Sequence, residues 1–142
     1  MNFLEINWAA FAVVFVVGFV FNSLWFGPKT FYPVWWRLMS DRPIPTRENQ
    51  ASSPVALFGL TILGSLVQLS AIALSLQVLE SLNGSVSLVD GLLVGLFISV
   101  TAAMYSIGHR MFAGHGVKVW LIEVTPDILV AIFAGIIFAI WR

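Results

Sequence analysis

The stretch VKVWLIEVTPDILVAIFAGIIFAIW, residues 117–141, sets the architecture of this chain. As an α-helix rising about 1.5 Å per residue it is long enough to cross about 30 Å of hydrocarbon. It nevertheless contains two carboxylates, Glu123 and Asp127, one helical turn apart. A charge near the centre of a bilayer costs at least about 2.5–3.5 kcal/mol, so such a residue usually has a partner or a function. The stretch therefore predicts a membrane span that contributes to a polar site.

Three further apolar segments predict an integral membrane protein. Apolar residues make up 59% of the 142 residues, and charged residues make up 10%, against roughly 25% in soluble domains. The spans are expected at about residues 4–26, 54–79, 88–108 and 117–141. The connections after the second and third spans are short, which makes neighbouring helices antiparallel. We predict an all-α fold in which residues 1–142 form a single transmembrane four-helix bundle.

The connection at residues 27–53 predicts a short helix at the membrane surface. Its first half, PKTFYPVWWRLM (28–39), is aromatic and cationic, as helices of the headgroup region are, and Pro33 starts or interrupts it. We interpret it as an interfacial anchor, with a lid or a docking surface for a partner as the alternative. The second half is polar and contains prolines, which is typical of an irregular linker.

The distribution of Lys and Arg predicts the orientation of the chain in the membrane. Six of the seven fall in or beside the first and third connections: Lys29, Arg37, Arg42, Arg47, Arg110 and Lys118. Only Arg142 lies on the other side. Because cytoplasmic loops carry an excess of Lys and Arg, these connections are expected in the cytoplasm and both termini outside. Tryptophans, which prefer membrane interfaces, mark the same boundaries.

Small residues recur every four positions in three of the spans, a spacing that lets membrane helices approach closely. The third span has the series Gly91, Gly95, Ser99 and Ala103, and the fourth has Ala131, Gly135 and Ala139. The first span has a shorter series of Ala10, Gly18 and Asn22, which Val14 interrupts. Glu123 and Asp127 continue the series of the fourth span at the same spacing. The two acids are therefore expected to face protein and not lipid.

Polar residues at similar depth predict a binding pocket in the cytoplasmic half of the bundle. Its candidate residues are Asn22, Thr101, Tyr105, His109, Glu123 and Asp127. Pro126 lies between the two acids and should free the carbonyl of Ile122, kinking the helix. Broken helices in transporters use such carbonyls as ligands, although a proline can also merely adjust packing.

Several classes of chemistry lack a signal in this sequence. Without cysteine there is no disulfide, no thiolate metal site and no cysteine nucleophile. Zero net charge and the lack of a basic run make nucleic acid an unexpected partner. There is no HExxH metal motif, nucleophile elbow or phosphate-binding loop. His109 or His115 could ligate the metal of a haem or a chlorin, although each is more typical of an ordinary loop histidine. The cofactor and any metal remain open.

Nearly the whole chain carries short motifs of one membrane family. They are LWFGPKTF (24–31), WWRLM (35–39), GHGVKVWLIEVTPDIL (114–129) and the closing FAGIIFAIWR (133–142). On these motifs the chain resembles an uncharacterised bacterial family, domain of unknown function 1761. The resemblance implies four spans and a location in the bacterial inner membrane. It implies no particular activity.

Three functions remain open, in the order in which the sequence favours them. The first is an accessory or assembly subunit that docks laterally in a membrane complex, its acids pairing with His109, Arg110 or a partner. The second is a homo-oligomer that binds or transports a small solute, with Glu123 and Asp127 exchanging protons or cations. The third is a membrane enzyme for a hydrophobic substrate, with His109 and the acids as metal ligands or acid–base pair. The sequence favours a protein without enzymatic activity.

Overall fold

The structure, a computed structural model, describes residues 5–40, 44 and 53–141 and confirms the all-α membrane fold. The helices of this part of the chain are α1 Trp8–Trp25, α2 Tyr32–Met39, α3 Pro54–Asn83, α4 Leu88–Phe112 and α5 Gly116–Ile140. Among the described residues, α1, α3, α4 and α5 are long and apolar enough to cross a membrane. The short helix expected after the first span is α2, and Pro33 lies in its first turn, where a proline removes no helical hydrogen bond.

Three helices begin where a polar side chain caps the backbone, and in α3 the cap is Ser53, whose Oγ accepts a hydrogen bond from the N–H of Ala56. α1 starts at Trp8, and not at residue 4, because the Asn7 side chain accepts hydrogen bonds from the backbone N–H groups of Ala9 and Ala10. At the start of α4, Ser87 and Asp90 satisfy each other's backbone N–H groups in a capping box. These local interactions place the first turns independently of tertiary packing.

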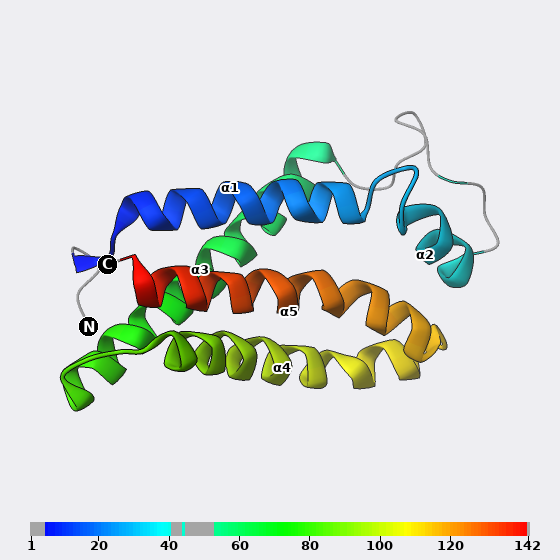
Figure 1. Ribbon diagram of the computed structural model, residues 1–142. Coiled ribbons are helices and arrows are strands. Elements are labelled where there is room, and N and C mark those ends of the chain that lie inside the picture. The colour runs from blue at the N-terminus through cyan, green and yellow to red at the C-terminus, as the bar shows by residue number, and fades with distance from the viewer. Residues whose placement is uncertain (1–4, 41–43, 45–52, 142) are drawn as a thin grey trace.

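Two helices continue about one turn past the predicted spans. α3 runs to Asn83, where Gly84 adopts the left-handed conformation, with φ of 77°, that commonly ends a helix. α4 runs to Phe112, so His109 and Arg110 belong to its last turn and not to a connection. The residues between α4 and α5 are therefore only 113–115. This short connection holds the two helices antiparallel over most of their length (Figure 1).

α5 is the centre of the fold. It contacts each of the other four described helices, and its most extensive interface is with α4. Figure 1 shows α1, α5 and α4 side by side, with α3 crossing behind them. The small-residue series of α4 and α5 face each other, because a side chain added at Gly91 or Gly95 would collide with the backbone of Gly135 or Ala131. Ser99 and other members of the series are buried in the same interface: Ala103, Ala131 and Ala139.

α1 packs on α5 through the series that Val14 was expected to interrupt. Val14 and Ala10 are fully buried, and Gly18 on the same face is buried as well. Phe11 on this face stacks on Phe138 of α5, with 5.9 Å between ring centroids. The hydrophobic core therefore lies in the half of the bundle where α1 begins and α5 ends.

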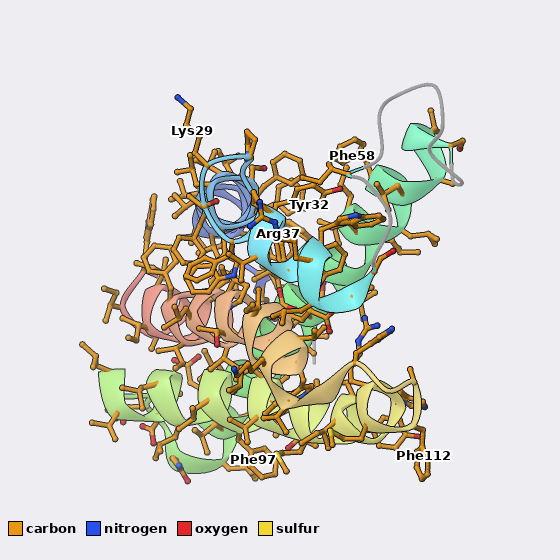
Figure 2. The ribbon with its side chains drawn as sticks, turned by 90° about the vertical axis from the view of Figure 1, so that its right-hand side faces the viewer. Lys29, Tyr32, Arg37, Phe58, Phe97 and Phe112 are labelled. Carbon is orange, nitrogen blue, oxygen red and sulfur yellow. The ribbon has the colours of Figure 1, made fainter. Side chains whose placement is uncertain are left out.

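α3 packs against this core only through its second half. Leu69, Ile72 and Leu76 are buried in the core. No described side chain between positions 55 and 67 is buried. Figure 2 shows this first half lying far from α4, at the opposite side of the molecule. The helix therefore diverges from the bundle toward the end that carries α2.

The described charges separate between the two ends of the bundle. The end that carries α2 is also where α4 ends and α5 begins (Figure 1), and all described Lys and Arg residues belong to these segments: Lys29, Arg37, Arg110 and Lys118. Glu5, Glu80 and Asp90 lie toward the other end. Arg42, Arg47 and Arg142, which also contribute to the predicted orientation, lie outside the described residues. Which end faces the cytoplasm stays a prediction.

Candidate functional site

Glu123 is engaged by side chains from two other helices. Its Oε2 lies 2.6 Å from Nε of Arg110 on α4, and its Oε1 accepts a hydrogen bond of 2.9 Å from Nε1 of Trp35 on α2. The Glu123 side chain is 17% exposed, and that of Arg110 is 36% exposed. Both carboxylate oxygens thus have a partner and the charge is neutralised. Glu123 connects α2, α4 and α5, which is a structural role.

Pro126 leaves the carbonyl of Ile122 without its helical donor, as the sequence predicts. The indole of Trp25 on α1 supplies a replacement, because its Nε1 donates a hydrogen bond of 3.0 Å to that carbonyl. α5 remains one helix from Gly116 to Ile140. A freed carbonyl in a span must find a donor within the protein, and here it does. This oxygen is therefore already engaged and is not an open ligand.

Replacing Trp25 by phenylalanine is expected to lower the free energy of unfolding by about 1–2 kcal/mol, because the Ile122 carbonyl would lose its donor. Denaturant unfolding in detergent micelles measures the change. Trp8→Phe is the matched control, since Trp8 lies on the same helix, is 53% exposed and donates no hydrogen bond within the described residues. Equal losses in both variants would contradict a role for this hydrogen bond.

Trp25, Trp35 and Trp120 each donate a hydrogen bond into the protein at the α2 end. Besides Trp25 and Trp35, Trp120 of α5 donates from Nε1 to the carbonyl of Ala103 at 3.0 Å and to Oγ of Ser106 at 3.1 Å. From the sequence these tryptophans were predicted only to mark the membrane interfaces, and their role as donors was not predicted. A tryptophan at a span boundary can mark the membrane interface or donate a hydrogen bond within the protein. Its position in the sequence is the same in both cases, so the sequence does not distinguish these two roles.

Asp127 has surroundings opposite to those of Glu123. Among the described residues no Lys, Arg or His pairs with its carboxylate, and no hydrogen bond satisfies it. It lies one turn deeper in α5, beside α3, where it lines two separate hollows, and it is exposed, so the expectation that both acids are enclosed by protein does not hold for Asp127. An unpaired carboxylate inside a span marks a candidate functional site.

The smaller hollow lies between α1, α3 and α5. Its volume is about 30 Å³, room for about two water molecules. Four polar residues line it: Asn22, Ser65, Gln68 and Asp127. Asn22 also donates a hydrogen bond of 3.3 Å from Nδ2 to the carbonyl of Gly18. Asn22 and Asp127, which were predicted to share a pocket, thus line the same hollow.

The larger cavity lies between α3 and α4, with α5 along one side. Its volume is about 470 Å³. Gln68 and Asp127 line it as well, together with Ser99 and Ser106 of α4. Much of the remaining wall is apolar or small: Gly64, Val67, Ala71, Ile98, Ala102 and Val124. Asp127 and Gln68 therefore stand between the two hollows and belong to both.

Thr101, Tyr105 and His109 do not join either acid. All three are exposed, and Tyr105, which is 81% exposed, packs edge-on against His109 with 5.9 Å between rings. Two residues advance about 200° around a helix, so Thr101 points away from the face that buries Ser99. The six candidate residues thus separate into the Glu123 cluster, the Asn22–Asp127 hollow and this outward stripe.

The described residues contain no group of three His, Asp or Glu side chains placed to hold a metal ion. His109 lies exposed on the outer face of α4. His115 precedes α5 and is half-buried, and its Nδ1 is buried without a hydrogen-bond partner. A role for either histidine as a haem or chlorin ligand stays a prediction.

The four long apolar helices and the carboxylate inside α5 define a small multi-pass membrane protein. The family described as Protein of unknown function (DUF1761) matches residues 9–139, and the chain belongs to it, as its motifs indicated. No curated protein and no solved structure matches the chain. The family description names no activity.

Proposed function

We propose that this protein binds a small cation inside the membrane, with the carboxylate of Asp127 as its counter-charge. The observation that carries the proposal is that Asp127 has no partner among the described residues while it lines both hollows. The sequence suggested a cation-coupled function that uses both acids. Only Asp127 is proposed for it here, because Arg110 neutralises Glu123. A location in a bacterial inner membrane with both termini outside is part of the proposal.

The electrostatics of the site favour a cation over an anion or a neutral ligand. Charges interact strongly where little water surrounds them, so an uncompensated carboxylate attracts positive charge. Gln68, Asn22 and Ser65 add neutral polar groups beside it and no positive charge. Arg110 of α4 is paired with Glu123, with 2.6 Å between Nε and Oε2. The site therefore lacks one positive charge.

Carbodiimide modification tests the proposal. Dicyclohexylcarbodiimide partitions into bilayers and reacts with protonated carboxyl groups, so it should modify Asp127 and spare the ion-paired Glu123. Peptide mass spectrometry of the protein in lipid nanodiscs locates the adduct. Among sodium, potassium, ammonium and benzyltrimethylammonium ions, at least one should slow the modification several-fold.

Two variants serve as controls for this experiment. Asp127→Asn should remove the adduct, and Glu123→Gln should leave it in place. An unmodified Asp127, or a rate that none of the four cations changes, would overturn the proposal. The carbodiimide assay thus reads the site directly, without an assumed transport activity.

Lateral docking in a larger complex is the second candidate, and the first half of α3 favours it. This half is exposed, and Gly59 and Gly64 leave open space above the backbone, where a partner helix could approach closely. A fixed partner chain in native mass spectrometry would support this function. The enzyme alternative required His109 beside the acids, and His109 lies on the outer face of α4, so we do not propose it.

A further inference from the structure

We infer that the cation bound at Asp127 is a lipophilic organic cation, an ammonium group with an apolar body, held in the larger cavity between α3 and α4. The inference rests on the proposed function, because it names the class of cation that this site takes. It follows from the size of the cavity, the chemistry of its wall and the side on which it opens.

The size of the cavity favours an organic ligand. A volume of about 470 Å³ falls within the roughly 300–1,000 Å³ of pockets that hold small molecules. A benzyl or short alkyl ammonium ion fits such a space, whereas a bare metal ion would leave most of it empty. The adjacent hollow of about 30 Å³ is too small for an organic body.

The polar groups of the cavity are fewer than the oxygen ligands that a divalent metal cation takes. Hard cations such as Ca²⁺ and Mg²⁺ take about six or more oxygen ligands. The described wall has Asp127, Gln68 and two serines, and these serines already donate to backbone carbonyls of α4. Ser99 Oγ donates to Gly95 at 2.8 Å, and Ser106 Oγ donates to Ala103 at 2.7 Å. An alkylated ammonium needs a counter-charge but no complete oxygen shell.

The opening of the cavity indicates the route by which the ligand arrives. Gly64, Val67 and Ala71 of α3 and Ala102 of α4 line the cavity and are exposed. They lie within helices that are long enough to span a membrane, so this side faces the hydrocarbon. α3 diverges from α4 toward the same end (Figure 2). A ligand that enters here must first partition into lipid, which requires an apolar body.

Equilibrium binding to the protein in nanodiscs tests the charge requirement. The probe is benzyltrimethylammonium, and its control is neopentylbenzene, which has the same shape with carbon in place of the charged nitrogen. We expect saturable binding of the cation and at least about tenfold weaker binding of the neutral compound, a difference of about 1.4 kcal/mol. Asp127→Asn should weaken binding of the cation by a similar factor. Equal affinities for the two compounds would overturn the inference.

Cavity-filling variants test the location without changing Asp127. Ala71→Leu and Ala102→Leu add side-chain volume from the two facing walls of the cavity. Each should weaken binding of benzyltrimethylammonium at least about tenfold, since a filled pocket cannot hold the ligand. Ala56→Leu makes the same change on the exposed first half of α3, away from both hollows, and should leave binding unchanged. Wild-type affinity in both filling variants would overturn the inference.

The two proposals fail in different ways. If sodium or potassium protects Asp127 from carbodiimide while benzyltrimethylammonium does not bind, the inference is wrong and the proposed function stands. If no cation protects Asp127, both are wrong. Protection by benzyltrimethylammonium together with the cavity-filling effect supports both.

Discussion

Gly95→Ala should destabilise this protein severely, although the change adds a single methyl group. The new Cβ would collide with the backbone carbonyl of Ala131 on α5. A carbonyl inside a helix cannot rotate away as a side chain can, so α4 and α5 would have to separate along their tightest contact. Overpacking usually costs about 1–3 kcal/mol, and we expect at least the upper end of this range.

A second glycine of α4 is the matched control. Gly108 has open space where its Cβ would lie, so Gly108→Ala meets no neighbour. Helix propensity alone favours alanine over glycine by roughly 1 kcal/mol, and this variant should be neutral or more stable. Unfolding of both variants in mixed micelles gives the comparison. If Gly95→Ala unfolds like Gly108→Ala, the close approach of α4 and α5 is wrong.

Arg110→Met is the second change for which we expect a large effect. It leaves the carboxylate of Glu123, which is 17% exposed, without a positive partner inside the bundle. Losing one member of a buried ion pair costs about 3–5 kcal/mol. The loss should be smaller here, about 2–3 kcal/mol, because Arg110 is 36% exposed and its surroundings partly screen the pair.

A double-mutant cycle isolates the cause of that loss. Adding Glu123→Gln to Arg110→Met removes the unpaired charge and keeps an oxygen that can accept the hydrogen bond from Trp35. The double variant should therefore be more stable than Arg110→Met alone. Strictly additive losses, with Glu123→Gln alone as the second single variant, would show that Arg110 and Glu123 do not interact. The measurement is again the free energy of unfolding in micelles.

The membrane helices and the faces suited to close packing could be predicted from the sequence. A span must satisfy its backbone hydrogen bonds internally, so a long apolar segment has few alternatives to a helix. Regularly spaced glycines in a span are also informative, because only the smallest residues permit backbone contact between helices. This is why the series at Gly91 and Gly95 indicated a face for close helix packing, and the structure shows that α5 packs on it. The carbonyl that Pro126 frees was predictable for a similarly local reason.

The partners of the polar residues could not be predicted in the same way. Arg110 was one of several candidate partners for the acids, and nothing in the spacing of Glu123 and Asp127 separated their roles. Residues four apart differ by about 40° around a helix. That rotation directs Glu123 to Arg110 and Trp35 and leaves Asp127 facing α3. Which of the two acids is paired depends on where α2 and α4 end, and therefore on packing.

The larger cavity depends entirely on the tertiary structure. Residues 55–67 and 69–76 of α3 are similarly apolar, yet the first stretch diverges and the second is largely packed in the core. Lipid tails are as apolar as leucine, so composition does not distinguish a side chain that faces lipid from one that faces protein. The class of protein, the spans and the acid inside α5 follow from the amino-acid sequence. The pairing of Glu123, the exposure of Asp127 and the cavity beside it arise only from the way the helices pack.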